Sequence, residues 1–300
     1  MNWIRTTALL MLLAVASAAQ AETVTNVARG KPVTLLGGTF FLGGWDGATI
    51  SDPATITDGL FFPQSSVWDV GTIWWDAGYG ETYGSQAIQV DLGGAYVIES
   101  LIVQADDNDT YEVTYLSAET GTWVHAWTAG PIGPWGMQTR PNPLDDTERY
   151  VLDGPIKATA LRVTGIWPSD FKYSVSEIQA FGYPLVVPVS IDVKPGSDPN
   201  SINLGSEGTI AVAVFGSASF DATSIDLSTV TFANAQVATK RSGAYLYAIE
   251  DVNGDGIADV VLHVYTQDLV LSDNATEAVL DGWTNAGRPF RGTDLVRVVP

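Results

Sequence analysis

The feature that most constrains the fold is a series of short runs in which apolar or β-branched residues alternate with polar ones. Clear examples are residues 87–92, 99–104, 111–115 and 160–164. Gly, Asp, Asn and Pro separate the runs, and no long stretch repeats its apolar residues at helical spacing. The sequence therefore predicts an all-β protein.

The chain divides into an export signal and two further parts. Residues 1–21 have the pattern of a secretory signal peptide: Arg5, an apolar stretch and a small-residue cleavage site. That apolar stretch is too short to span a bilayer. We expect a protein secreted to the periplasm or the exterior without membrane insertion, with domains at 22–184 and 190–300 and a linker at 185–189.

The cysteine count and the net charge limit how the fold can be stabilised and which classes of partner the chain can bind. The chain has no Cys, so no disulfide supports the fold despite the predicted export. Its formal net charge is −20. Nucleic acids and anionic lipids are poor partners for such a chain, because phosphate binding depends on clustered Lys and Arg. The charge is compatible with calcium and with neutral or cationic surfaces.

Residues 251–259 have the spacing of a calcium-binding loop. Asp251, Asn253, Asp255 and Asp259 occupy positions 1, 3, 5 and 9, a Gly stands at position 6, and Ile257 supplies the position 7 carbonyl. Position 12 is Leu where an EF-hand has Glu, and the next residues are strand-like. The loop is more similar to the calcium loops between strands of integrin-type repeats. The alternative is a metal-free Asp/Asn/Gly turn.

An aromatic, Gly-rich loop at residues 67–83 is the first candidate ligand site. Flat rings stack on the C–H faces of sugars, while carboxylates bond the hydroxyl groups. Trp74 and Trp75 are adjacent and point apart if extended, so at most one is expected to face a ligand. Asp76 follows them directly. Trp68 is expected in the core.

Two further loops carry candidate ligand-binding residues. Asp106, Asp107 and Asn108 follow a strand-like run, and a later loop holds Trp135 and Arg140. The acidic loop has two alternatives, a solvated turn and a second metal site. For Arg140 the alternative is a surface ion pair with an acid of residues 145–148, an interaction that contributes little stability.

The order of the motifs in residues 22–184 resembles the discoidin, or coagulation factor 5/8 type C, family. This galactose-binding-like family includes many bacterial carbohydrate-binding modules. The resemblance implies an eight-stranded jelly-roll sandwich whose loops at one end bind ligand. The motifs lie at residues 26–33, 56–59, 90–93, 112–115, 121–123, 149–152, 160–164 and 175–182.

The resemblance also implies a structural calcium ion held near an Asp-Gly loop. Asp58 and Glu177 match the family's positions, although Leu60 stands where a second acid is usual. Residues 191–204 resemble the opening of a secreted bacterial β module without an assigned activity, and this module implies a second, smaller β-sandwich. There, the carboxylates of the 251–259 loop would repel one another without metal, so calcium is expected to stabilise the module.

Catalytic motifs are absent from the sequence. The chain has two His and no Cys, and it lacks a Gly-x-Ser-x-Gly elbow, a zinc motif and a P-loop. The predicted function is therefore that of a secreted, non-enzymatic glycan-binding protein with calcium-stabilised β domains. The alternatives are an adhesive extracellular matrix protein that binds other proteins and, ranked last, a polysaccharide hydrolase or lyase.

Overall fold

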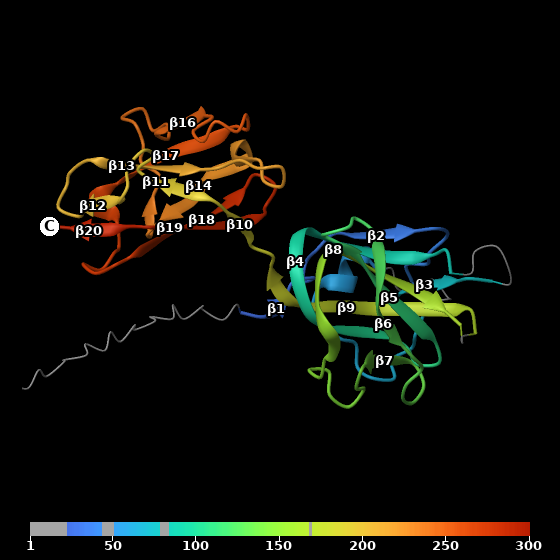
Figure 1. Ribbon diagram of the computed structural model, residues 1–300. Helices are drawn as coiled ribbons and strands as arrows, with labels where there is room; N and C mark the ends of the chain where they lie inside the picture. Colours follow the sequence, from blue (N-terminus) through green and yellow to red (C-terminus); the bar gives the residue numbers. More distant parts are fainter. Residues whose placement is uncertain (1–22, 44–50, 79–83, 168–169) are drawn as a thin grey trace, which may run out of the picture.

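A computed structural model describes residues 23–43, 51–78, 84–167 and 170–300 (Figure 1). Strands dominate this part of the chain, and its helical content is limited to three short 3₁₀ turns. The all-β prediction is confirmed. Buried apolar side chains form two separate clusters, one drawn from residues 27–180 and the other from residues 191–296. The predicted signal peptide lies outside the described residues.

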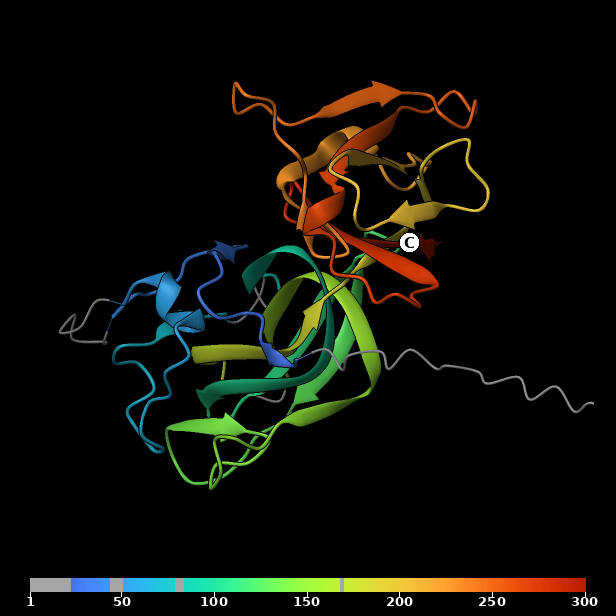
Figure 2. The same cartoon turned by 90° about the vertical axis from the view of Figure 1, so that its left-hand side faces the viewer.

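The N-terminal unit is built around three long strands. Its main sheet has the order β1-β9-β4-β8-β5-β6, while β2 and β7 pair with β4 and β3 pairs with β9. Figures 1 and 2 show these strands curled around one another, and their buried side chains form the first core cluster. Its elements are β1 (Thr25–Asn26), β2 (Val33–Leu36), η1 (Pro53–Thr57), β3 (Ile73–Asp76), β4 (Ala87–Asp106), β5 (Thr110–Ser117), β6 (Trp123–Ala129), β7 (Met137–Arg140), β8 (Tyr150–Ile166) and β9 (Lys172–Pro184).

Strand β4 bends along its length and pairs with four other strands of this unit: β2, β7, β8 and β9. Its pairing with β8 shifts register between Asp91 and Tyr96 and again between Ile98 and Ser100. Its first residues pair with β2, and its last residues pair with β7 and β9. Bulges of this kind bend a strand and increase its twist. The strand therefore ends, at Asp106, in the loops at one end of the sandwich.

The C-terminal unit is a second, smaller sandwich, as predicted. A five-stranded sheet, β10-β19-β18-β14-β15, and a four-stranded sheet, β11-β13-β17-β16, supply the second core, with the pair β12-β20 beside them. The strands are β10 (Val187–Val189), β11 (Ile191–Val193), β12 (Ser201–Asn203), β13 (Thr209–Val214), β14 (Ile225–Phe232), β15 (Ala235–Gln236), β16 (Tyr247–Glu250), β17 (Asp259–Tyr265), β18 (Glu277–Thr284), β19 (Pro289–Leu295) and β20 (Arg297–Val299); the 3₁₀ turns are η2 (Ala222–Ser224) and η3 (Thr266–Asp268).

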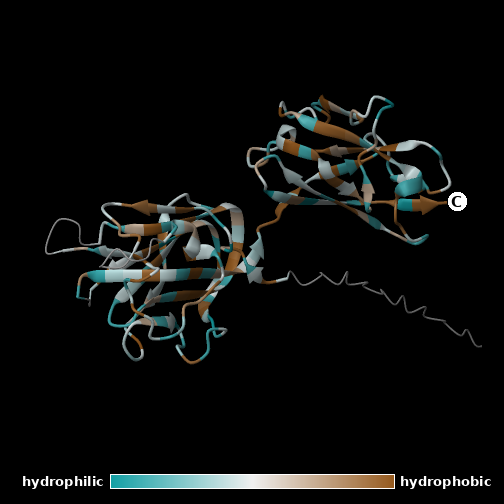
Figure 3. Ribbon diagram, turned by 180° about the vertical axis from the view of Figure 1, so that it is seen from behind, coloured by the Kyte–Doolittle hydropathy of each residue, from teal (hydrophilic) through white to brown (hydrophobic). Residues whose placement is uncertain are grey.

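The connection between the units is shorter than the predicted linker at 185–189. The N–H of Leu185 donates to the carbonyl of Ala95 at 2.9 Å, and β10 pairs in parallel with β19 from Val187 onward. The segment is hydrophobic (Figure 3), and a Val-rich run next to a free strand edge adds to that sheet. Only Val186 separates the two sets of bonds. Across the described part of the chain, no helix combines the length and apolar character needed to cross a membrane.

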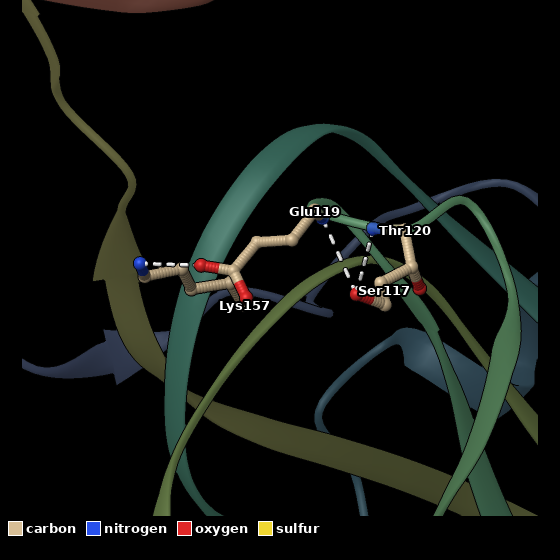
Figure 4. Close-up of polar contacts among 4 residues, drawn as sticks. All are labelled: Ser117, Glu119, Thr120 and Lys157. Atoms are coloured by element: carbon tan, nitrogen blue, oxygen red, sulfur yellow. Dashed lines mark hydrogen bonds and ion pairs between the residues drawn. The ribbon is translucent and has the colours of Figure 1, made fainter.

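The β5–β6 turn closes the end of β5 that lies away from Asp106. The hydroxyl of Ser117 accepts the N–H groups of Glu119 and Thr120, both at 3.2 Å (Figure 4). Glu119 also forms an ion pair with Lys157 at 2.7 Å, and both side chains are largely exposed. Exposed pairs of this kind contribute little stability, which makes the turn a useful control location for mutagenesis.

Candidate ligand-binding site

The adjacent rings of Trp74 and Trp75 both lie in the core, which corrects the expectation that one of them faces a ligand. Trp74 is 4% exposed, and its indole N–H donates to the carbonyl of Gly43 at 2.6 Å. Trp75 is 1% exposed and stacks on Tyr173 with the ring centroids 5.3 Å apart. The two rings do point apart, but each side of β3 is covered. Neither face is available to a sugar.

Asp76 ends β3 and is exposed. Its Oδ1 accepts the N–H of Gly78 at 2.9 Å, so the carboxylate stabilises the following turn. The remainder of the predicted aromatic loop, residues 79–83, lies outside the described residues. Asp76 is therefore exposed as a ligand-binding residue would be, but the two Trp rings predicted beside it are buried.

Arg140 is a structural clamp rather than a surface group. Its side chain is 1% exposed and donates to the carbonyls of Gly130, Ala105 and Gln138 at 3.0, 2.9 and 3.1 Å, and also to that of Asp106. Among the described residues it forms no ion pair with the acids of residues 145–148. Burial corrects both the predicted ligand contact and the alternative surface pair.

The acidic turn between β4 and β5 combines exposed and buried side chains. Asn108 is exposed and Asp107 is half-buried, and the Asp107 Oδ1 accepts the N–H of Gly136 at 2.6 Å. Asp106 and Asp109 are 4% and 0% exposed. The Asp109 Oδ1 accepts no hydrogen bond from any residue in the described ranges, while its Oδ2 lies 3.4 Å from the Tyr111 hydroxyl.

Burial changes the protonation of this turn. It raises the pKa of Asp109 to about 8, and the negative charges of Asp106 and Asp170 add to the rise. It also raises the pKa of Asp106 to about 7, with a further contribution from the charge of Asp107. At neutral pH these two buried carboxyl groups are therefore largely protonated, so they can donate as well as accept hydrogen bonds inside the turn.

Two exposed tryptophans lie on the loops that contact this turn. Trp135 is 58% exposed and immediately precedes Gly136, which donates to Asp107. Trp167 is 65% exposed, and Asp170, three residues later, donates its backbone N–H to Asp109. Sequence reasoning missed Trp167 and Asp170. The sequence did contain a pattern that could have identified them: a Trp and then an Asp follow the strand-like run at residues 160–164. The pattern is weak, because the end of the strand and the start of the loop are hard to separate in this segment.

Asp58 and Glu177, the two predicted calcium ligands of this unit, lie close together. Glu177 is fully buried; its Oε1 accepts the N–H of Gly59 at 3.0 Å and the amide of Gln179 at 3.1 Å. Its Oε2 is buried without a hydrogen-bond partner in the described structure. Burial raises the pKa of Glu177 to about 8, and the charge of Asp58 adds to the shift. A cation would satisfy this oxygen, so the residues fit one.

The 251–259 loop folds around its first residue. The carboxylate of Asp251 accepts the N–H groups of Gly254, Asp255 and Gly256 at 2.8, 3.1 and 3.0 Å. Asp259 is buried, and its two oxygens accept backbone N–H groups at 2.8 and 2.9 Å. Within the described ranges, no three His, Cys, Asp or Glu side chains gather closely enough to hold a metal. In this conformation the loop does not form a carboxylate cage.

Comparisons with known proteins give similarities in structure only. No protein-family model matches the chain, and no curated protein matches its sequence. Many of the structural neighbours are carbohydrate-binding modules. The family 32 module of NanJ from C. perfringens, in complex with galactose, is 15% identical over 53% of this chain and 99% of its own, with a TM-score of 0.34.

Two other neighbours show the same level of similarity. Chitosan-binding module 1 of a chitosanase/glucanase from Paenibacillus sp. IK-5 is 18% identical over 53% of this chain and 99% of its own, with a TM-score of 0.32. SpGH29 is 14% identical over 54% of this chain, with a TM-score of 0.33, and the match spans 28% of its length. TM-scores of this size say little about function, which must come from the chain's own residues.

Proposed function

We propose that the protein is a secreted, non-catalytic glycan-binding protein. The observation that carries this proposal is the pair of exposed tryptophans, Trp135 and Trp167, on the loops that contact the acidic turn. Indole faces stack on the C–H faces of sugar rings, and the exposed Asn108 and half-buried Asp107 of the turn offer polar groups to hydroxyl groups. Because the chain carries a net charge of −20, neutral or cationic glycans are favoured over anionic ones.

Removing either ring tests this proposal. Trp135→Ala and Trp167→Ala should each weaken glycan binding about tenfold, because alanine removes a stacking contact of roughly 1–1.5 kcal/mol. The measurement is a glycan array followed by calorimetry on the mature protein. Glu119→Gln, in the turn at the other end of β5, is the matched control and should bind normally. Equal binding by all variants, with each shown to be folded, would remove these loops from the site.

An adhesive matrix protein is the second candidate, and a specific feature supports it. Edge strand β16 exposes Tyr247 and Ile249, which are 45% and 54% exposed on an unpaired sheet edge. Exposed apolar edges are surfaces on which other chains can pair. Self-association of the mature protein in light scattering without any sugar, abolished by Ile249→Lys, would favour this candidate over glycan binding.

Calcium binding is the second part of the proposal, and Glu177 supports it most directly. Its buried Oε2 has no hydrogen-bond partner in the described structure and lies next to Asp58, and a bound calcium ion would displace the proton that burial favours on this carboxyl and take the oxygen as a hard ligand. When bound, calcium would supply charge neutralisation there. At the 251–259 loop the proposal rests on the ligand spacing alone, and Asp251, Asn253, Asp255 and Asp259 would be the ligands, with the carbonyl of Ile257.

Calcium should raise the melting temperature of the mature protein, and chelator should lower it, because a ligand specific for the folded state stabilises it by about 2.7 kcal/mol at a hundred times its dissociation constant. Glu177→Gln and Asp251→Asn separate the two sites. Each variant should lose part of the calcium response, measured by calorimetry. A response that survives both substitutions would place calcium elsewhere, and no response in the unaltered protein would exclude it from both.

A further inference from the structure

The outer face of the five-stranded sheet in the C-terminal unit carries an aromatic residue and an ion pair in adjacent rows. Along β18 the burial alternates, so Val279, Asp281 and Trp283 face outward while their neighbours face the core. Trp283 is 40% exposed. Asp281 lies opposite Arg291 of β19, and Trp283 lies opposite Pro289. Strand register thus places an indole and a guanidinium–carboxylate pair as diagonal neighbours on one face.

These side chains border a shallow pocket of about 270 Å³. Pro184 at the end of β9 and Val186 of the connecting segment line it, together with residues of β18 and β19: Asp281, Gly282, Trp283, Pro289, Phe290 and Arg291. The volume is below the roughly 300–1,000 Å³ of enclosed small-molecule sites. A site of this size and depth suits a ligand that lies along the surface and inserts one ring.

The chemistry of the pocket indicates an uncharged, polyhydroxylated ligand. Arg291 Nε and Asp281 Oδ1 are 2.6 Å apart, and the side chains are 54% and 44% exposed. Their opposite charges cancel locally, which removes the attraction for an ionic ligand, yet the half-exposed Asp281 carboxylate still offers acceptors to hydroxyl groups. The indole and the half-buried Pro184 provide the apolar surface on which the C–H face of a sugar ring packs.

We propose that this pocket is a second glycan-binding site, which takes a short stretch of a neutral polysaccharide. It is separate in residues from the site at Trp135 and Trp167 and does not depend on that site being correct. With both sites, the protein binds one polymer chain at two points, and the second contact is strengthened by the effective concentration that the first creates.

The test follows the indole N–H signals of the ¹⁵N-labelled mature protein by NMR during titration with neutral oligosaccharides of β-linked glucose, galactose or mannose. The signal lost in Trp283→Phe identifies Trp283. The proposal predicts that this signal shifts with at least one series and still does so in Trp135→Ala. No movement with any of the three series, or movement abolished by Trp135→Ala, would overturn the proposal. Movement of Trp283 alone would instead leave it standing and contradict the loop site.

Affinity measurements add an independent readout. Trp283→Ala should weaken binding of the responding oligosaccharide to this site at least tenfold, and it should also weaken binding of the corresponding polysaccharide, because two-point attachment is lost. Leu295→Ala is the matched control: Leu295 is 67% exposed on the same strand as Arg291 but lies outside the pocket. Equal loss in Leu295→Ala and Trp283→Ala would show a non-specific effect and overturn the proposal.

Discussion

At the scale of single residues, Asp109 has the most unusual environment in the N-terminal unit. It is fully buried, it faces Asp106, Asp170 and Tyr111, and Arg140 lies nearby. A carboxyl whose pKa rises from 3.8 to about 8 binds more protons in the folded state than in the unfolded state between those pH values. Its contribution to stability is therefore full below about pH 4 and declines as the pH rises to about 8.

Replacing this carboxyl with an amide should flatten the pH dependence. We expect the free energy of unfolding of the unaltered protein to fall between pH 5 and pH 8, and that of Asp109→Asn to fall less, since each pKa unit represents about 1.4 kcal/mol. Urea denaturation at the two pH values measures the difference. Parallel slopes for the two proteins would contradict the raised pKa.

The sequence indicated that aromatic residues would form the candidate site, but it did not indicate which of them are exposed. A loop rich in Trp and Gly indicated exposed rings, yet Trp74 and Trp75 are covered because residues distant in sequence, Phe40, Phe41 and Tyr173, pack on both sides of β3. Trp135 stands between Pro134 and Gly136 in another predicted ligand-binding loop and is exposed. Such burial is a tertiary property that local sequence does not encode.

At the scale of elements, the close approach of β9 to β4 depends on one glycine. A Cβ atom on Gly182 would lie 1.9 Å from the carbonyl oxygen of Val97, and backbone cannot move aside cheaply. Gly182→Ala should therefore lower the free energy of unfolding by at least about 2 kcal/mol. Gly154→Ala in β8, where a Cβ meets nothing within 4 Å, is the control and should change stability little. Chemical denaturation of both variants checks the contrast.

The sequence predicts the individual strand-like runs, but it does not predict that two of them form one continuous strand. Residues 87–92 and 99–104 show alternation separately, and the Gly93–Gly94 pair between them is typical of a turn. In the structure both runs belong to the single strand β4, because bulges absorb the glycines and bend the strand. In the C-terminal unit, the Val-rich segment predicted as linker joins a sheet because β19 offers it an edge.

At the scale of the whole molecule, the two core clusters share no residue. Cavity-forming substitutions should therefore act on one unit at a time. Val163→Ala in the first core and Val212→Ala in the second should each cost on the order of 2 kcal/mol and lower a different transition in scanning calorimetry. A single transition that shifts equally in both variants would show that the units unfold together.

The single residue between the two sets of backbone bonds has a consequence for where a protease can cut the chain. A protease cuts where it can draw several residues of extended chain into its cleft, and such segments are exposed and free of regular bonds. Leu185 is tied to Ala95 and Val187 to Phe290, so the junction offers no segment of that length. Digestion should begin elsewhere, and the two halves should stay covalently joined while surface loops are trimmed.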